Sequence, residues 1–352
     1  MKVTKYEIDM LNVKAADACL IHFFDEHDND YVVLVDAGNY GDGQVVVDFI
    51  KNRYGKSTID LAICTHCDSD HFGGFIYLLE QIRDNTKNKI TIKEIWVHDP
   101  ADHIELGQIK WVRKEETKNV KARSVYDLGD KNMLDILDGL ANQIKWFEPF
   151  SDAAEFENQP YRASVFDGKI EVVGPSVEFY ESLVVDFRND LSRKDYNTNE
   201  DEDDSAELKA DGTIYSKTLD DAGDDPSDQN QSSVMFVFKP DDNKKFFFMG
   251  DAGRKAIDNL KYKSDKDLIN KVHWLKVPHH GSKYNLDNEM ISHIHPTIAY
   301  ISTEKVGHYL SMAVVNGLKK CNCSVFSTHQ TSSIWHHKNI IQRADYSNAV
   351  PL

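Results

Sequence analysis

The sequence lacks any hydrophobic run that approaches the ~20 consecutive apolar residues of a membrane-spanning helix, which argues against a helical membrane protein. Its first residues, MKVTKYEIDMLNV, lack the apolar core and the small-residue cleavage site of a secretory signal, so we do not expect export by that route. Cysteine is scarce as well, and the five cysteines lie inside apolar runs, as is typical of reduced thiols. We therefore expect a soluble protein of the cytoplasm with no membrane partner.

Positive charge is also in short supply, with 41 Lys and Arg against 58 Asp and Glu and a formal net charge of −17. Because phosphate neutralisation dominates nucleic-acid binding, this balance argues against an extended basic groove and leaves room only for a local basic strip. Residues 186–229 alone hold 15 acidic and 5 basic residues. This segment is predicted to be a solvated acidic loop, with a regulatory or protein-binding surface as the alternative.

What the sequence does contain is an alternation of short apolar runs, polar turns and helical stretches. Strands are predicted at 5–11, 18–24, 31–38, 60–65, 169–175, 232–240, 244–253, 271–282, 297–303 and 323–328. Helices are predicted at 43–55, 75–84, 254–262 and 311–320. The pattern favours one α/β domain spanning residues 1–352. Two stretches interrupt it: a mixed, partly helical insertion at about 100–165 and the acidic loop at about 186–229.

The segment THCDSDHFGG, residues 65–74, places His66, Asp68, Asp70 and His71 between the end of a strand and the start of a helix, where α/β proteins bind ligands. His66 and Asp68 alternate in an extended segment and face the same way, while Asp70 and His71 lie at the turn. Two divalent metals can therefore be held side by side. The glycines that follow let the helix begin close to the metals. Helix capping by an aspartate is the alternative, but it does not account for two histidines.

This cluster resembles the His-x-His-x-Asp-His signature of the metallo-β-lactamase fold, with Asp68 in place of the second histidine. The departure is similar to the hydrolase domain of the ComEC competence proteins, where His-x-Asp-x-Asp-His-x-Gly-Gly is the usual form. MLNVKAADACLI resembles the opening run of that domain, although Asn12, Lys14, Ala15 and Ala16 depart from it. The resemblance runs from about residue 8 to 326 and implies a four-layer αββα sandwich with insertions.

The resemblance also implies roles for residues outside the cluster. YVVLVDAG places Asp36 at the first acid of the family, and FFFMGDAG places Asp251 at the aspartate that bridges two metals. LKVPHHGSKYN matches the late histidine segment, in which one of His279 and His280 is a ligand and the other supports the metals or contacts substrate. We favour His280 as the ligand. The predicted metal ligands are thus His66, Asp68, Asp70, His71, Asp251, His279 and His280.

Further matches concern catalysis and substrate contact. VGHYLS places His308 where the family has Gly-His-Pro, and NQSSVMFVF supplies the Asn-x-x-Ser that precedes the bridging aspartate. The predicted catalytic residues are Asp36, Asp70 and His308, and the predicted substrate contacts are Asn230, Ser233 and Ser282. Each match has an ordinary alternative: a turn acid at Asp36, a helix cap at Asp251 and a surface histidine at His308.

Other candidate ligands compete with this set. No third histidine of a typical first-metal site is evident, and VHDPADH offers His98 and His103 as rivals, with a strand-end loop as the alternative. Cysteines at 64, 67, 321 and 323 could form a zinc site, but the single-residue gap of the second pair differs from the usual two-residue spacing. We expect these cysteines to pack in the core.

The predicted function follows from the metals. Two ions bridged by Asp251 would hold a shared water as hydroxide, so no serine or cysteine nucleophile is required. The carboxylate-rich ligand set is compatible with manganese as well as zinc. The resemblance implies phosphodiester hydrolysis, with DNA or a smaller diester as substrate, and the acidic composition favours the smaller one. The predicted function is a metal-dependent phosphodiesterase or nuclease. A carboxyl-ester or lactone hydrolase, or a binding protein on a weakened hydrolase scaffold, is the alternative.

Overall fold

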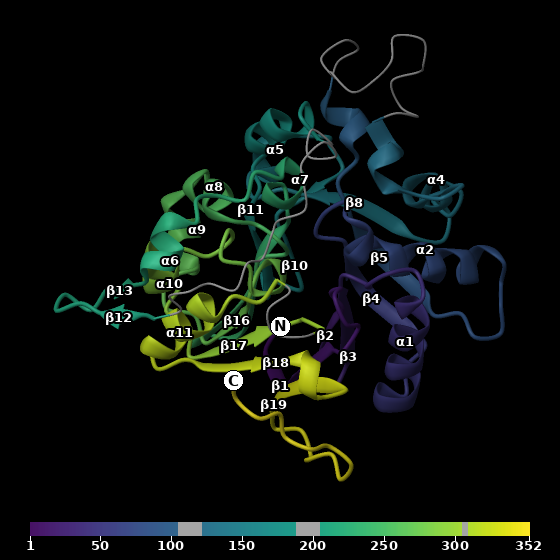
Figure 1. Cartoon of the computed structure of the whole chain (residues 1–352). Helices are drawn as coiled ribbons and strands as arrows, with labels where there is room; N and C mark the ends of the chain where they lie inside the picture. The colour runs from purple at the N-terminus through teal and green to yellow at the C-terminus, as the bar shows by residue number, and fades with distance from the viewer. Residues whose placement is uncertain (105–121, 188–204, 305–308) are drawn as a thin grey trace.

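The computed structural model describes residues 1–104, 122–187, 205–304 and 309–352. Two β-sheets lie face to face, and helices cover the outer face of each, which makes four layers (Figure 1). The αββα sandwich predicted from the sequence is therefore confirmed.

The first sheet has eight strands in the order β19-β1-β2-β3-β4-β5-β8-β9. In chain order these are β1 (Val3–Leu11), β2 (Cys19–Asp25), β3 (Asp30–Val35), β4 (Thr58–Ile63), β5 (Thr91–Trp96), β8 (Lys145–Pro149), β9 (Tyr161–Arg162) and β19 (Ser333–Lys338). Strands β3, β4, β5 and β8 pair in parallel, whereas β19, β1, β2 and β3 pair antiparallel. The carboxyl ends of β3 and β4 therefore open at the same edge.

The second sheet has seven strands in the order β10-β11-β14-β15-β16-β17-β18. These are β10 (Ser164–Val165), β11 (Ile170–Gly174), β14 (Met235–Asp241), β15 (Lys244–Phe248), β16 (Trp274–Lys276), β17 (Ile298–Ile301) and β18 (Ser324–Ser327). Strands β15 to β18 are parallel, so their carboxyl ends also share one edge. Two small ribbons complete the strands: β6 (Asp127–Leu128) with β7 (Lys131–Asn132), and β12 (Glu207–Leu208) with β13 (Ile214–Tyr215).

Helices form the two outer layers (Figure 1). The first sheet is covered by α1 (Asp42–Phe49), which continues as the π-helical η1 (Ile50–Tyr54), by α2 (Ser69–Arg83) and by α4 (Met133–Asp138). On the side of the second sheet lie α5 (Val177–Val184), α6 (Lys217–Asp221), α7 (Asp228–Gln231), α8 (Arg254–Asp258), α9 (Lys263–Leu268), α10 (Asn288–Ile294) and α11 (Met312–Lys320). The 3-10 turns are η2 (Pro100–His103), η3 (Arg123–Tyr126), η4 (Ala153–Glu155), η6 (His279–Gly281) and η7 (Thr328–Gln330). No helix in the described ranges has both the length and the apolar character to cross a membrane.

The period of two along each strand divides the core into an inner and an outer part. Alternate residues of both sheets meet in a largely aromatic inner layer, which includes Tyr6, Phe23, Trp96, Phe236, Phe238, Phe246, Phe248 and Trp274. The intervening residues of the same strands pack outward against the helices. Each large apolar side chain buried in this way contributes roughly 1.5–3 kcal/mol, so the inner layer fixes how the two sheets face each other.

The stretch at about 100–165, which was predicted to be an insertion, supplies strands to both main sheets. Strand β8 pairs in parallel with β5 and so extends the first sheet, while β10 forms the edge of the second sheet. The short run KWFEP has only two fully buried residues, which is why its pattern did not predict a strand. In the acidic segment, β12, β13, α6 and α7 lie within the described part, and residues 188–204 lie outside it. All five cysteines are buried as thiols rather than joined in disulfides, as expected.

Candidate metal centre

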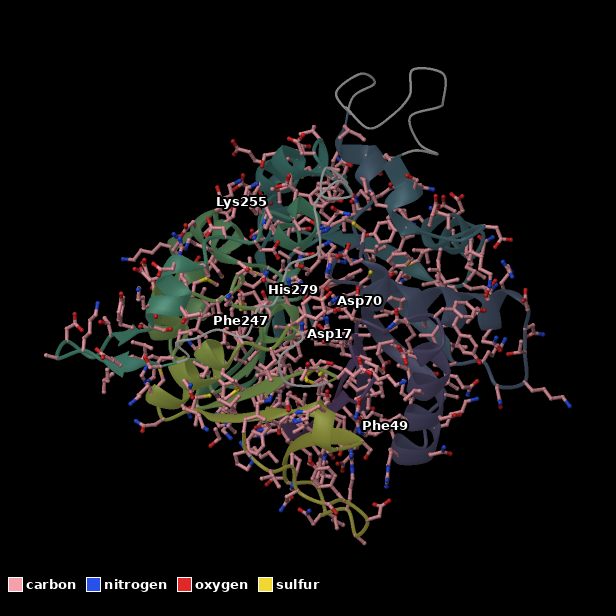
Figure 2. All side chains as sticks on the ribbon, in the orientation of Figure 1. Asp17, Phe49, Asp70, Phe247, Lys255 and His279 are labelled. Carbon is pink, nitrogen blue, oxygen red and sulfur yellow. The ribbon has the colours of Figure 1, made fainter. Side chains whose placement is uncertain are left out.

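A cluster of acids and histidines lies where the strand ends of the two sheets meet. Asp17 follows β1, Asp36 follows β3, and the segment from His66 to His71 follows β4. The second sheet contributes Asp251 after β15 and His279 and His280 after β16. Figure 2 shows Asp17, Asp70 and His279 close together between the two halves of the molecule. The site is thus built from loops at the carboxyl ends of strands, as is usual for ligand sites in α/β proteins.

Asp36 orients two imidazole rings of the cluster. Its Oδ2 lies 2.8 Å from His71 Nδ1 and accepts a hydrogen bond of 2.8 Å from the Thr65 hydroxyl. The Thr65 Oγ1 in turn lies 3.1 Å from His66 Nδ1. Because the hydroxyl proton points to Asp36, the network assigns the Nδ1 proton to both histidines and leaves each Nε2 as an acceptor. Asp36 has a φ of 54°, a costly conformation for aspartate, which its backbone and side-chain bonds hold in place.

The Nε2 atoms of His66 and His71 point into a ring of carboxylates. Neither atom has a hydrogen-bond partner among the described residues, although both side chains are fully buried. The Nε2 of His71 lies 3.4 Å from Asp251 Oδ2 and 3.7 Å from Asp70 Oδ2, and the Nε2 of His66 lies 3.7 Å from Asp68 Oδ2. Ligands at about 2.1 Å from a tetrahedral metal are separated by about 3.4 Å, so these spacings suit a shared cation.

Three overlapping groups among the described residues have the composition of a metal site. They are His66, His71 and Asp251; Asp70, His71 and His280; and Asp17, Asp36 and His71, with the ligand atoms of each group within 4.8 Å of one another. The side chain of Asp68 is 38% exposed and that of Asp70 is 30% exposed, whereas the histidines are buried. The site therefore opens to solvent on the side of these two aspartates.

The two late histidines are held differently. His280 Nδ1 hydrogen-bonds the carbonyl of Ser302 at 2.9 Å, which turns its Nε2 to within 3.3 Å of Asp70 Oδ2. His279 Nδ1 lies 3.1 Å from Asp225 Oδ2, and the His279 backbone N–H donates to Asp251 Oδ1 at 3.0 Å. His280 thus belongs to a candidate ligand group. His279 lies beside that group, and Asp225 fixes the position of its Nδ1.

The clustered acids produce a strongly negative potential. Burial opposes the charge on His71, yet the carboxylates of Asp251, Asp36 and Asp70 raise the pKa of His71 well above its usual value. Burial likewise opposes the charge on His279, but Asp251 and Asp225 raise the pKa of that imidazole to about 9. Such a potential attracts cations, protons or divalent metals alike.

The glycine pair after the cluster allows α2 to approach β3 closely. A Cβ on Gly74 would lie 2.0 Å from the carbonyl oxygen of Ala37, which is backbone and cannot yield. Asp68 begins the helix, but within the described chain its carboxylate makes no capping hydrogen bond. Gly74 therefore allows α2 to pack close to the segment after β3. Asp68 contributes a carboxylate to the cluster and does not cap the helix with it.

The predicted substrate contacts lie behind the cluster. Ser233 is buried, and its Oγ accepts a hydrogen bond of 3.0 Å from the Asp251 backbone N–H. Asn230 Nδ2 donates to Asp225 Oδ2 at 2.8 Å, and Ser282 Oγ accepts from the backbone N–H of Tyr284 at 3.2 Å. These side chains hold the loops that carry Asp251 and His279. His308 lies outside the described residues.

Four buried polar residues of the site were not predicted from the sequence: Asp17, Asp225, Lys276 and Asn285. Lys276 forms an ion pair with Asp17, and Asn285 Nδ2 donates to Asp225 Oδ2 at 2.7 Å. A lysine inside the otherwise apolar strand run HWLKV was a usable signal, because the period of two places it on the inner face with Trp274. Asp225 and Asn285 carried no comparable signal, since both follow turn-like sequence.

His98 and His103, the rival ligands, lie apart from the candidate groups. His98 Nε2 hydrogen-bonds the carbonyl of Pro149 at 2.9 Å, and its ring packs on Phe150 and Tyr180. His103 Nε2 lies 3.0 Å from Glu148 Oε1. His98 precedes η2 and His103 ends it, and both rings contact residues of β8. Their contacts within the described residues are therefore structural.

Buried His98 predicts a specific acid sensitivity. Burial lowers its pKa to about 3, so the folded chain holds it neutral while the unfolded chain protonates it below pH ~6.5. The stability that neutral His98 contributes to the folded state is fully present above pH ~6.5. It is lost as the pH falls toward 3, at up to ~1.4 kcal/mol of unfolding free energy per pH unit. Urea unfolding of His98→Gln between pH 6 and pH 4 should show a correspondingly shallower loss of stability. The same substitution at exposed His27 is the control, and equal slopes for both variants would contradict the prediction.

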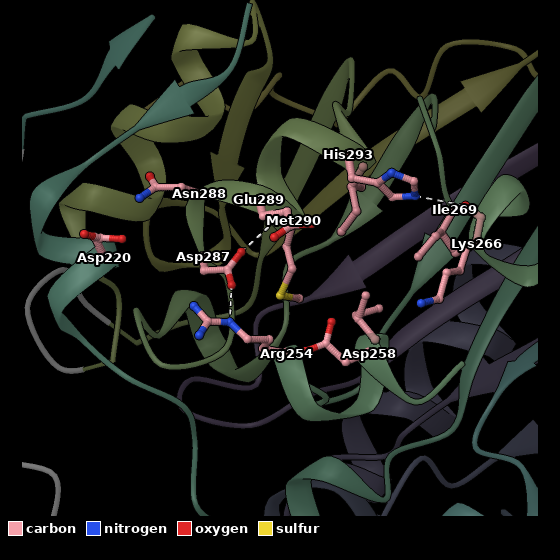
Figure 3. Close-up of a pocket in the computed structure, with 12 residues that line it drawn as sticks. Asp220, Arg254, Asp258, Lys266, Ile269, Asp287, Asn288, Glu289, Met290 and His293 are labelled. Atoms are coloured by element: carbon pink, nitrogen blue, oxygen red, sulfur yellow. Dashed lines mark hydrogen bonds and ion pairs between the residues drawn. The ribbon is translucent and has the colours of Figure 1, made fainter. Parts of the chain in front are cut away.

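A separate cavity of about 360 Å³ lies among α8, α9 and α10 (Figure 3). Arg254 on its wall is ion-paired with Asp287, and His293 Nε2 hydrogen-bonds the carbonyl of Lys266 at 2.9 Å. None of the residues that line it belongs to the candidate metal groups. This cavity is therefore distinct from the strand-end cluster.

Comparison with known proteins agrees with this geometry. The family model of the metallo-beta-lactamase superfamily matches residues 16–139, which include Asp36 and the whole cluster from His66 to His71. No curated protein matches the chain. Members of this superfamily are generally metal-dependent hydrolases that bind divalent ions, and the chain has candidate ligand groups for such ions.

Two solved structures are similar to the chain at low identity. The metallo-beta-lactamase fold protein YhfI from Bacillus subtilis has 10% identity and a TM-score of 0.43, over 94% of this chain and 99% of that one. A long form RNase Z from yeast has 14% identity and a TM-score of 0.37, over 85% of this chain but only 37% of the RNase Z chain. On the family match and its four-layer architecture, the chain has the metallo-β-lactamase superfamily fold.

Proposed function

We propose that the chain is a metal-dependent phosphodiesterase or nuclease that holds two divalent ions, zinc or manganese. The observation that carries this proposal is the pair of buried Nε2 atoms, on His66 and His71, which lack partners among the described residues and face three aspartates. A buried imidazole without a partner is costly, and a cation bound by the ring removes that cost.

The charge of the cluster supports two ions. Asp17, Asp36, Asp68, Asp70 and Asp251 supply five negative charges, and Lys276 supplies one positive charge. With neutral imidazoles the formal charge is −4, which two divalent cations balance. All three candidate groups share His71, which supports adjacent rather than separate ions.

Each residue then has a defined task. His66, Asp68 and Asp251 would hold one ion, and Asp70, His71 and His280 the other. Divalent ions at such a site lower the pKa of water and neutralise charge that develops on a phosphoryl group. Asp36 keeps the rings of His66 and His71 in the ligating tautomer.

The substrate would approach from the exposed side of Asp68 and Asp70. His279 lies at that border with its Nδ1 fixed by Asp225 and its side chain 13% exposed, so its Nε2 edge is available for a substrate oxygen. The chain-wide charge of −17 favours a short diester over a long polyanion. The first assay should include DNA and RNA as well as small diesters, so that this preference is tested directly.

The test is hydrolysis by metal-free protein that is reloaded with Zn²⁺ or Mn²⁺. Bis(p-nitrophenyl) phosphate, single- and double-stranded DNA, RNA and a p-nitrophenyl carboxyl ester are the substrates, with Asp70→Ala as the control. We expect metal-dependent hydrolysis of a phosphodiester that the variant lacks. Hydrolysis of the carboxyl ester alone would replace the phosphodiesterase with an ester hydrolase. A folded protein that binds no divalent ion would exclude the proposed metal chemistry.

A further inference from the structure

Lys276 occupies a position that strand geometry assigns to the core. It ends β16, where it pairs with Phe248 of β15 and Tyr300 of β17, and its side chain is 5% exposed. Trp274, two residues earlier, points into the aromatic layer between the sheets, and Lys276 shares that face. An ammonium group is rarely buried without partners, so its three N–H bonds need acceptors.

The ammonium finds those acceptors at the back of the metal centre. Lys276 Nζ donates to the carbonyl of Gly250 at 2.8 Å, forms an ion pair with Asp17 and lies 3.4 Å from Asp251 Oδ1. Asp17 is itself buried, and its backbone N–H donates to the carbonyl of Asp70 at 3.1 Å. The lysine is therefore fixed by the first sheet through Asp17 and by the second sheet through its own strand.

This arrangement divides the two oxygens of Asp251 between different partners. Oδ1 accepts the His279 backbone N–H at 3.0 Å and faces Lys276 Nζ at 3.4 Å. Oδ2 faces His71 Nε2 at 3.4 Å. Because a carboxylate rotates as a rigid group, partners that hold Oδ1 also fix where Oδ2 points.

A small cavity shows that the lysine is shielded from solvent. It has a volume of about 10 Å³, room for a single water, and its lining includes Asp17, Asp36, Thr65, Gly250 and Lys276. In such an enclosed place the attraction between an ammonium and a carboxylate is much stronger than at the surface. Lys276 therefore attracts the Asp251 carboxylate from a fixed position, which a mobile counterion would not do.

We propose that Lys276, anchored by Asp17, is a positioning residue that fixes the Asp251 carboxylate so that only Oδ2 is presented to the metals. This inference rests on the proposed metal-dependent function. Groups that orient a ligand without touching the metal typically affect metal affinity by about 10–100-fold. We expect a loss in that range for Lys276→Met, which keeps the apolar stem and removes the charge.

The experiment measures Mn²⁺ and Zn²⁺ affinity by titration calorimetry and the Co²⁺ absorption spectrum, which reports ligand geometry. Lys276→Arg, which retains the charge, should recover part of the affinity. Lys245→Met is the matched control, because Lys245 lies on β15 and bonds the carbonyls of Asp267 and Asn270 instead of the cluster. It should bind metal as the natural chain does.

The double variant Asp17→Asn/Lys276→Met separates positioning from simple charge pairing. If Lys276 served only to neutralise Asp17, the double variant would regain natural affinity and a natural Co²⁺ spectrum, which would overturn the inference. If Lys276 positions Asp251, the double variant stays impaired. It also leaves no unpaired carboxylate at position 17, so it carries the test should Lys276→Met fail to fold.

The remaining outcomes separate the inference from the proposed function. Natural affinity and a natural Co²⁺ spectrum in folded Lys276→Met would refute the positioning role and leave the function standing. Absence of metal binding in the natural chain would refute the function and the inference with it.

Discussion

Asp251→Asn should lower phosphodiester hydrolysis by about 10³-fold, which corresponds to a loss of ~4 kcal/mol of metal-based stabilisation of the transition state. The substitution keeps the size of the side chain, and an amide oxygen can still accept the His279 N–H that now reaches Oδ1 at 3.0 Å. What it removes is the negative charge of an acid whose Oδ2 lies 3.4 Å from His71 Nε2 and whose Oδ1 lies 3.4 Å from Lys276 Nζ. Both proposed ions would lose a shared ligand.

Metal content and activity should therefore fall together. Steady-state kinetics with bis(p-nitrophenyl) phosphate, or with the best substrate found, gives the activity, and elemental analysis after gel filtration gives the metal content. The control is Asp25→Asn, another buried acid, which accepts hydrogen bonds from Asn29 and Tyr31 at the opposite end of β2. An Asp251→Asn protein with natural metal content and natural activity would contradict the proposed role of Asp251.

The parts of this site that could be predicted from sequence are those encoded within a few residues. The cluster from His66 to His71 is such a case, since its spacing alone places two imidazoles and two carboxylates on one loop at a strand end. Asp36 and Asp251 were located through the family resemblance of the segments YVVLVDAG and FFFMGDAG, which are themselves only a few residues long.

Other parts depended on contacts between distant segments. Asp17 and Lys276 are 259 positions apart, and neither has meaning for the site until the two sheets stack. The apolar run HWLKV was a signal that Lys276 faces inward, but the sequence did not indicate which acid of the first sheet would pair with it. The assignment of β8 failed for a related reason, because a short edge-like run is defined by its pairing with β5 rather than by its own pattern.

Distant contacts also determine stability, and the largest such effect is expected at Arg343. This residue follows β19 and reaches back to β1, where Nη1 and Nη2 each lie 2.7 Å from an oxygen of Asp9. Nη2 also donates to Glu7 Oε2 at 2.7 Å, and the guanidinium lies 4.4 Å from the ring centroid of Trp335. Asp9 is fully buried, and burial raises its pKa in spite of Arg343. Asp9 therefore has Arg343 as its cationic partner, whereas Glu7 also lies 2.9 Å from His22 Nδ1.

Arg343→Met should lower the free energy of unfolding by about 3–5 kcal/mol, because it leaves buried Asp9 without its cation and removes one cationic partner of buried Glu7. Urea unfolding followed by tryptophan fluorescence measures the change. Arg53→Met is the matched control, since Arg53 also binds an aspartate through two nitrogens but at a site where Asp345 is 61% exposed. Exposed pairs of this kind contribute little because water screens them, so the control should unfold almost as the natural chain does.

The triple variant Glu7→Gln/Asp9→Asn/Arg343→Met tests the cause of that loss. With both acids neutral, the unpaired charge disappears, and the triple variant should be more stable than Arg343→Met alone. If instead the single and triple variants lose the same stability, the loss arises from the packing of Arg343 on Trp335 rather than from the buried charges. Equal stability of Arg343→Met and Arg53→Met would mean that the anchoring of the C-terminal segment to β1 contributes nothing to the fold.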